Sequence, residues 1–280
     1  MRTRRVLWFS LIAYGVTWFL VLPLVLQNAG RMPFQIPGLW HGAGALGPLV
    51  AAFFMRRGSD PQAGLGDLYR RQGPAGVSAW LQWVMVMTPL ILAGLTLAGV
   101  AAFWGPLDFS GLAEALASPA WVASTAVGSV LYGLGEEPGW RGWLLPHLQE
   151  NRGAVRATLI LSLIWAGWHA PFFFYRFPFE GAITIVGFFI GMLAGAFWLT
   201  FLFNSTGGSV WAVVFWHMIW NVVSISALQM SEPVIAILNA LMMVLGFGAV
   251  VLWGRQDLTL WPGSRTESSP NRAAAPDGGS

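Results

Sequence analysis

Two adjacent carboxylates and an arginine interrupt an otherwise apolar stretch, in the segment GEEPGWRGW. Glu137 and Arg141 are four residues apart, so on a helix they share one face and can form an ion pair. Glu136 lies about 100° further round such a helix and is free to point elsewhere. Pro138 removes one backbone hydrogen bond, to Leu134, and is expected to kink the helix beside the carboxylates.

Two histidines and an asparagine also lie deep in apolar segments. His169 occurs in IWAGWHAP, and His217 occurs in VWAVVFWHMIWN with Asn221 four residues further on, on the same helical face. At a rise of about 1.5 Å per residue, Glu136 and His169 lie about 18 Å from the cytoplasmic ends of their predicted spans, and His217 about 11 Å. Polar groups from three helices are therefore expected to meet within the membrane.

These residue types point to hydrolysis of an amide bond. A carboxylate and an imidazole can deprotonate and orient a water molecule, and a second imidazole with an amide donor can stabilise the oxyanion that forms at the carbonyl. Alternatively, two histidines and a carboxylate could hold Zn²⁺ with an open water position, in which case the ligands would be Glu136, His169 and His217. His41 and His147 lie at span ends and are assigned no part in the site.

Other signatures of chemistry are missing from the chain. There is no cysteine, which excludes a cysteine nucleophile, thiolate metal ligands and disulfides. The motifs HExxH and GxSxG, a P-loop and a dinucleotide fingerprint are absent. Glutamate and histidine inside a membrane are also typical of proton-coupled transporters, and a non-catalytic immunity or scaffold protein would keep the same fold. A transporter is expected to have matching broken spans in both halves, whereas this polar set is confined to three spans, which favours an enzyme.

The composition identifies an integral membrane protein. Of 280 residues, 56% are hydrophobic and only 10% are charged. We therefore predict an all-α fold, a polytopic bundle of about eight transmembrane helices. The windows long enough to cross about 30 Å of hydrocarbon lie near Val6–Leu26, Leu39–Met55, Trp80–Trp104, Trp121–Leu148, Ala157–Phe174, Ile183–Phe203, Val210–Leu228 and Val234–Trp253.

The arginines predict how the bundle is oriented. All 15 basic residues are arginines, and with the N-terminus inside only Arg31 and Arg176 fall on the outer side. Because positive side chains collect in cytoplasmic loops, both termini are predicted to be cytoplasmic. The net charge of +3 is then a feature of membrane topology and does not indicate nucleic-acid binding. Short loops and the absence of lysine favour a prokaryotic source, and hence the inner membrane.

The chain divides into one membrane domain at residues 1–255 and a polar tail at 256–280. The tail is rich in Pro, Gly, Ser and Ala and is expected to be disordered. Within the sixth span, Gly187, Gly191 and Gly195 are spaced by four residues, which predicts that a neighbouring helix approaches closely there.

The segments EEPGWR, WAGWH and HMIWN occur in this order along the chain. They resemble the EExxxR, FxxxH and HxxxN motifs of the CPBP family of intramembrane proteases, which includes the type II CAAX prenyl endopeptidases and the bacteriocin-immunity (Abi) proteins. The resemblance covers roughly Trp121–Leu228, and the plan of eight spans is also similar. Trp165 stands where the family pattern has phenylalanine.

The resemblance implies an intramembrane endopeptidase with a cavity that faces the cytoplasm. The site residues it implies are Glu136 and His169 to activate water, His217 and Asn221 as the oxyanion hole, and Glu137 and Arg141 to support the site or position the substrate. The implied substrate is a CAAX-type prenylated protein or a bacterial membrane or bacteriocin peptide, met at the lipid bilayer. The family's chemistry is written either for a metalloendopeptidase with Zn²⁺ or for a glutamate base without metal.

Overall fold

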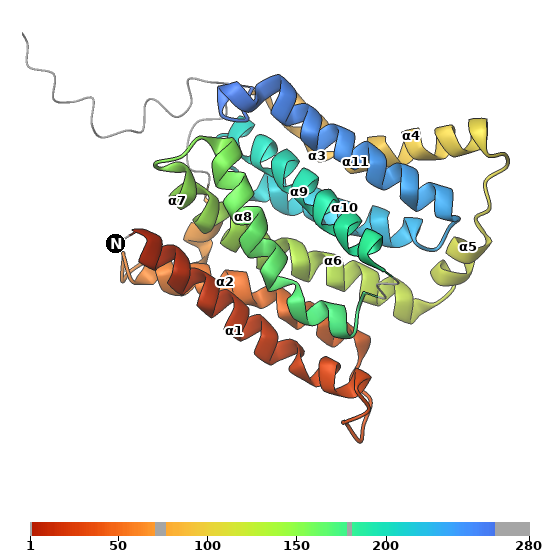
Figure 1. Ribbon diagram of the computed structural model, residues 1–280, viewed down its shortest axis with the longest axis horizontal. Coiled ribbons are helices and arrows are strands. Elements are labelled where there is room, and N and C mark those ends of the chain that lie inside the picture. The colour runs from red at the N-terminus through yellow and green to blue at the C-terminus, as the bar shows by residue number, and fades with distance from the viewer. Residues whose placement is uncertain (1, 71–76, 178–180, 261–280) are drawn as a thin grey trace, which may run out of the picture.

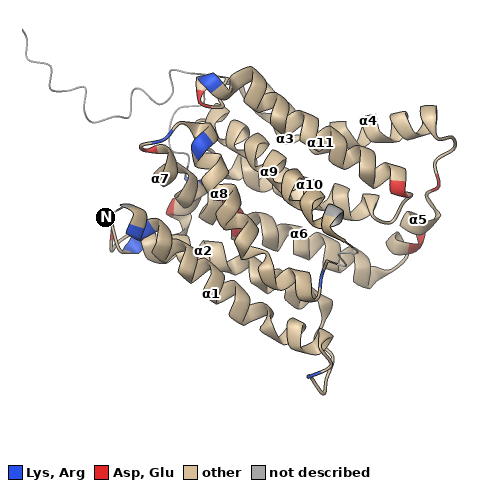
Figure 2. Cartoon of the chain, viewed as in Figure 1, with Lys and Arg blue, Asp and Glu red and all other residues tan. Residues whose placement is uncertain are grey.

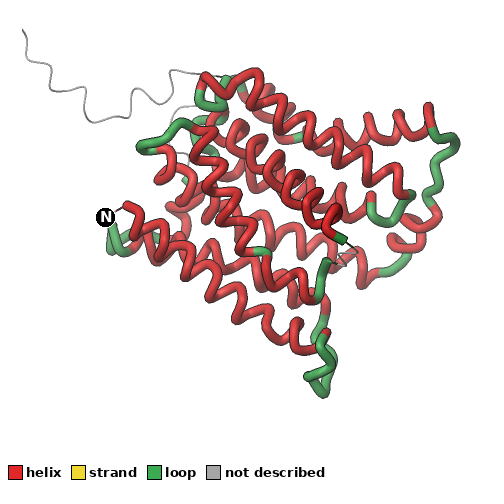
Figure 3. The backbone as a smooth tube through the Cα atoms, in the orientation of Figure 1, coloured by secondary structure: helices red, strands yellow, loops and turns green. Residues whose placement is uncertain are grey.

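The computed structural model describes residues 2–70, 77–177 and 181–260, and every regular element within these ranges is a helix (Figure 3). The elements up to the candidate site are α1 (Arg2–Asn28), η1 (Gly38–Ala45), α2 (Leu46–Arg57), η2 (Leu65–Tyr69), α3 (Ala79–Val86), α4 (Thr88–Phe103), α5 (Ser110–Leu116) and α6 (Pro119–Gly139). They continue with the π-helical turn η3 (Trp140–Leu144), α7 (Leu145–Gln149), α8 (Ala154–Trp168), η4 (Ala170–Phe174), α9 (Ala182–Ser205), α10 (Val210–Ala227), α11 (Glu232–Trp253) and η5 (Gly254–Gln256). The predicted all-α fold is confirmed.

The number of spans depends on how two bent helix pairs are counted. Within the described residues, six helices are long and apolar enough to cross a membrane, and the number rises to eight if each bent pair is one span. One pair is α3 with α4, bent by 49°, and the other is α5 with the helix that runs from α6 through α7, bent by 86°. The prediction of about eight spans therefore agrees with the upper count.

Most of the long helices lie side by side as a bundle, with α1 and α2 along one edge and α11 with α4 along the opposite edge (Figure 1). The helix α6 lies between its neighbours α2 and α10 and contacts both. The start of α1 and the end of α11 lie at the same end of the bundle (Figure 1), and most of the arginines drawn lie at that end (Figure 2). This arrangement agrees with the charge asymmetry on which the predicted orientation rests.

Of the three glycines of the sixth span, only Gly191 meets a neighbouring helix, and an added Cβ atom there would make an ordinary contact, 3.7 Å from the Met243 side chain of α11, that does not require glycine. A Cβ atom added at Gly187 or Gly195 would meet no atom within 4 Å. The tight contact between α9 and α11 instead involves Gly246, whose added Cβ would overlap the carbonyl oxygen of Ala194. The small residue that permits the approach therefore belongs to the partner helix, on the face turned toward α9.

The chain stays packed for a few residues beyond α11. Leu258 is fully buried, the Asn204 side chain donates to the Asp257 carbonyl at 3.0 Å, and the Leu260 amide donates to the Ser205 hydroxyl at 3.0 Å. Residues 257–260 belong to the segment predicted as the tail, and they pack against the end of α9. The rest of that tail, 261–280, lies outside the described residues.

Candidate active site

The helix that carries both glutamates changes geometry directly after them. It is α-helical as far as the end of α6 and then forms the π turn η3, a geometry often found at functional sites. Because Pro138 has no N–H, the carbonyl of Leu134 loses its usual helical partner. The Tyr69 hydroxyl, from η2, donates to this carbonyl at 2.8 Å. Burial raises the pKa of Tyr69, so the phenol keeps the proton that it donates.

Glycines on α6 let its neighbours approach the glutamate pair closely. A Cβ atom at Gly139 would lie 2.5 Å from Pro48 of α2, and one at Gly135 would overlap the carbonyl oxygen of Ala45. On another side of the helix, a Cβ atom at Gly133 would lie 2.6 Å from the Met218 side chain of α10. These contacts require hydrogen in place of a side chain, and they bring α2 and α10 against the segment that carries the charges.

Glu137 is fully buried and both of its carboxylate oxygens have partners. Arg141 Nη1 lies 2.9 Å from Oε1 and 3.1 Å from Oε2, which confirms the ion pair that the sequence spacing predicts. Nδ1 of His217, from α10, lies 2.7 Å from Oε1. An ionised carboxylate can only accept hydrogen bonds, so Nδ1 of His217 carries a proton. The carboxylate of Glu137 thus joins η3 to α10 through two cationic or polar partners.

Glu136 is nearly as buried, with 1% of its surface exposed, but its surroundings differ. Its Oε2 accepts two indole N–H groups, from Trp140 at 3.0 Å and from Trp165 of α8 at 2.7 Å. Its Oε1 has no hydrogen-bond partner in the part of the chain that the structure describes. Of the four carboxylate oxygens of the pair, this one is available to a water molecule.

His169 follows the last residue of α8 and is half-buried. Its Nδ1 lies 2.8 Å from the backbone carbonyl oxygen of Trp165, and because a carbonyl only accepts, Nδ1 carries the proton. In the neutral ring, Nε2 is then an acceptor. The ring packs edge to face against Trp168, with centroids 4.8 Å apart, and against Phe188 at 5.5 Å. This packing fixes the orientation of the imidazole.

The six predicted site residues are held together to different degrees. The Trp165 ring lies near both histidines, with its centroid 5.6 Å from that of His169 and 6.3 Å from that of His217. No direct hydrogen bond joins His169 to Glu136 among the described residues, and the two are linked through Trp165. Asn221 lies one turn along α10 from His217, half-buried, with no side-chain hydrogen bond to another described residue. It is the member whose side chain contributes nothing to the hydrogen-bond network.

The metal alternative was tested against the donor atoms. Among the described residues, no three side chains of His, Cys, Asp or Glu are grouped so that they could hold a metal ion. The hydrogen bonds of Glu136 and His217 engage Oε2 and Nδ1 and leave Oε1 and Nε2 without a partner in the described part of the chain, so it is the placement of the three side chains, and not their hydrogen bonding, that fails to form a ligand group. As arranged, the described residues do not fit a Zn²⁺ ion held by Glu136, His169 and His217.

A second histidine network, which sequence reasoning missed, lies beside the site. The Tyr132 hydroxyl, one turn along α6 from Glu136, is 2.6 Å from Nε2 of His41, and the Tyr175 hydroxyl is 2.5 Å from Nδ1. Burial raises the pKa of Tyr175, so this phenol stays neutral. The spacing of Tyr132 from Glu136 was the only local signal that could have placed the network here.

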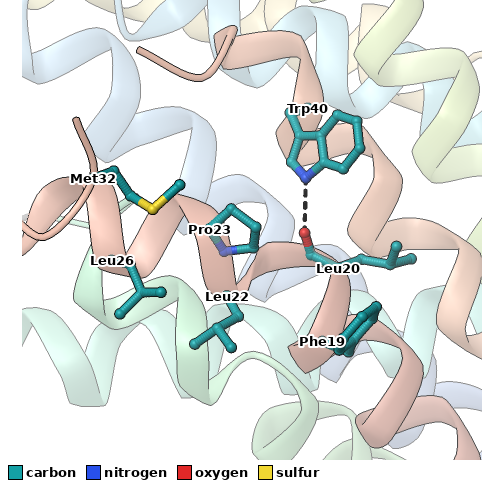
Figure 4. A pocket seen from close by; sticks show the side chains of 7 residues that line it. All are labelled: Phe19, Leu20, Leu22, Pro23, Leu26, Met32 and Trp40. Carbon is teal, nitrogen blue, oxygen red and sulfur yellow. Dashed lines mark hydrogen bonds between the residues drawn. The ribbon is translucent and has the colours of Figure 1, made fainter. Parts of the chain in front are cut away.

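An apolar groove of about 300 Å³ lies away from the charged residues, beside the second half of α1 (Figure 4). Trp40 lines it and donates its indole N–H to the Leu20 carbonyl at 2.8 Å (Figure 4). The groove is lined by Phe19, Leu20, Leu22, Pro23, Leu26, Met32 and Trp40. It contains no candidate catalytic residue, and a surface of this kind suits contact with lipid chains.

Comparison with known proteins places the candidate site within a known family model. Residues 118–223 match the family model described as "Type II CAAX prenyl endopeptidase Rce1-like". The matched segment begins directly before α6 and ends within α10, so it contains both glutamates, both histidines and Asn221. No curated protein matches the chain significantly. The match confirms the resemblance that the three motifs indicate.

Proposed function

We propose, from the match of residues 118–223 to the family model of Rce1-like type II CAAX prenyl endopeptidases, that the chain hydrolyses a peptide bond in a membrane-associated substrate with a water molecule activated by Glu136 and His169. The proposed substrate is a CAAX-type prenylated protein or a bacterial membrane or bacteriocin peptide. The proposed location is a prokaryotic inner membrane.

The observation that carries this proposal is the difference between the two neighbouring glutamates. Both oxygens of Glu137 are engaged by cationic or polar partners, which suits a structural counter-charge. Glu136 has one oxygen held by two indoles and one oxygen available. A general base needs an acceptor atom within reach of water and a fixed orientation, and Glu136 supplies both.

The first step is attack of water on the scissile carbonyl. Oε1 of Glu136 and Nε2 of neutral His169 are both acceptors, so a water molecule between them directs its hydrogens at the protein and a lone pair at the carbonyl carbon. Glu136 takes one proton as the C–O bond forms. When the C–N bond breaks, the protonated Glu136 returns that proton to the leaving amine, which balances the reaction.

His217 and Asn221 are proposed to stabilise the oxyanion. The amide of Asn221 can donate without any change of charge. His217 already donates through Nδ1 to Glu137, so its Nε2 can donate only when the ring carries both protons. The carboxylate of Glu137 favours that imidazolium form, and Arg141 holds the carboxylate in place. This gives the second glutamate a supporting role.

Cleavage by purified protein in liposomes tests the proposal. A fluorogenic CAAX peptide with its prenyl group, and the same peptide without it, would be incubated with wild type, Glu136→Ala and Glu114→Ala. Mass spectrometry in ¹⁸O-labelled water identifies the bond that is cleaved. Loss of a general base lowers the rate by about 10²–10⁴-fold, so Glu136→Ala is expected to be nearly inactive.

The control is Glu114, an exposed carboxylate of α5 outside the site. Its replacement by alanine is expected to leave cleavage unchanged. Unchanged cleavage by Glu136→Ala would contradict the assigned role of this glutamate. Equal cleavage of both peptides would show that the prenyl group is not part of what is recognised.

A further inference from the structure

Trp165 makes three contacts that connect the candidate catalytic groups. Its indole N–H donates to Oε2 of Glu136 at 2.7 Å, and its backbone carbonyl accepts from Nδ1 of His169 at 2.8 Å. Its ring lies under the guanidinium of Arg141, with Cζ 4.7 Å from the ring centroid. The side chain is buried, with 8% of its surface exposed. Trp165 of α8 therefore contacts Glu136, the Arg141 partner of Glu137, and His169.

The indole N–H is the contact that a different aromatic residue would not make. The family motif that WAGWH resembles has phenylalanine at this position, and phenylalanine has no donor. A phenylalanine could still pack beneath Arg141, and its backbone could still bind His169. The side-chain hydrogen bond to Glu136 is thus a property of this chain and is not available to a chain that follows the family pattern.

The geometry of Glu136 shows what this bond does. Trp140 and Trp165 both bind Oε2, so rotation that exchanged the two oxygens would break two hydrogen bonds within a buried site. Their N–H groups also favour the ionised carboxylate, which burial alone disfavours. Oε1 is left without a hydrogen-bond partner among the described residues and is therefore the acceptor that remains for a water molecule.

We propose that Trp165 is a positioning residue for the base: its indole N–H holds Oε2 of Glu136 so that Oε1 faces the water that attacks the substrate. Trp140, at 3.0 Å, supplies the weaker half of the same clamp. The inference rests on the proposed role of Glu136 as the base.

Kinetics of Trp165→Phe test the positioning role. A hydrogen bond to a charged group contributes about 1.5–3 kcal/mol, which corresponds to a fall of about 10–100-fold in kcat at 1.36 kcal/mol per tenfold. KM is expected to stay unchanged, because the lost contact is with the base and not with the substrate. Trp140→Phe is expected to give the same pattern with a smaller fall in kcat.

Trp198→Phe is the matched control. Trp198 of α9 is also buried, with 5% of its surface exposed, and its indole N–H has no hydrogen-bond partner among the described residues. The Trp198→Phe variant loses the same ring volume as Trp165→Phe but loses no hydrogen bond. Its kcat is therefore expected to stay at the wild-type value. An equal fall in kcat for Trp198→Phe and Trp165→Phe would mean that ring volume is responsible, and would overturn the inference.

A thermal double-mutant cycle separates this inference from the proposed function. Trp165→Phe is expected to lower Tm in the wild-type background. It is expected to lower Tm less in the Glu136→Ala background, because the hydrogen bond between Trp165 and Glu136 is already absent there. Equal Tm shifts in the two backgrounds would overturn the hydrogen bond itself. If Glu136→Ala is inactive while Trp165→Phe keeps the wild-type kcat, the base assignment stands and the positioning role fails. If Glu136→Ala is fully active, the proposed function fails whatever the Tm cycle shows.

Discussion

Two histidine networks contact α6, one around His217 and one around His41. Both histidines lie in apolar segments, but one network is charged and the other is neutral. His217 is bound by a carboxylate that also binds Arg141, so its network is charged. His41 is bound on both ring nitrogens by phenols, so its network is neutral. Each histidine lies in an apolar segment and neither has a local motif that reveals its partner. The hydrogen-bond partners of a buried histidine, and not its burial alone, therefore determine whether the imidazole can carry a charge.

The largest expected effect comes from breaking the charged network. Glu137→Ala leaves Arg141 and His217 buried without their counter-charge, which typically costs about 3–5 kcal/mol. We expect a large fall in Tm in detergent and loss of cleavage. The double variant Glu137→Met/Arg141→Met removes both charges and is expected to recover much of the stability but none of the activity. A Tm near the wild-type value for Glu137→Ala would show that the ion pair contributes little.

Removing each histidine in turn compares the two networks directly. His217→Ala is expected to lower kcat by about 10²–10³-fold, as for loss of one oxyanion-hole donor. His41→Ala removes the imidazole from both phenols, leaving Tyr132 only the backbone carbonyl of residue 41 at 3.3 Å, and is expected to cost about 1–3 kcal/mol of stability, with kcat of the folded protein little changed. Steady-state kinetics and Tm are measured on the same samples. Inactive but stable His41→Ala protein would place the neutral network within the active site.

A smaller effect is expected when one bond of the neutral network is removed. Tyr132→Phe keeps the ring and loses only the hydroxyl, so it should cost about 0.5–1.5 kcal/mol, measured as a shift in Tm. Tyr175→Phe is the companion variant and is expected to behave similarly. A fall in kcat without a fall in Tm for Tyr132→Phe would mean that this phenol acts on Glu136, its neighbour one helical turn away.

No effect at all is expected from a strong chelator. Among the described residues no three side chains of His, Cys, Asp or Glu are grouped so that they could hold a metal ion, so activity should be retained and elemental analysis should find no stoichiometric metal. Loss of activity with chelator, restored by Zn²⁺, would overturn this proposal. It would also change the comparison, because the charged network would then be a metal site.

Hydropathy and helical spacing were sufficient for most of the fold and part of the site. The spans could be predicted because each must cover the hydrocarbon core with apolar residues, and the bond between Glu137 and Arg141 because it lies within one helical turn. The contacts of Glu136 with Trp165, and of His41 with two tyrosines, join segments far apart in the sequence. They depend on how the helices pack, and no periodic pattern records that.

The same limit explains the error about glycines. Spacing by four residues places small residues on one face of a helix, but it does not say whether another helix meets that face. Gly187 and Gly195 face open space, whereas Gly135 and Gly139, which bracket the glutamates at the same spacing, are covered by η1 and α2. Only the three-dimensional packing distinguishes the two sets.

The bond between Tyr69 and the Leu134 carbonyl has a consequence for how the chain can evolve. Pro138 leaves that carbonyl without a helical partner, and the tyrosine is useful only as long as the proline is there. A residue with an N–H at position 138 would satisfy the carbonyl itself and free position 69 to drift. Conversely, a lineage that keeps the proline is under selection to keep a donor in η2. Positions 69 and 138 are 69 residues apart in the sequence. They are nevertheless expected to change together in aligned relatives.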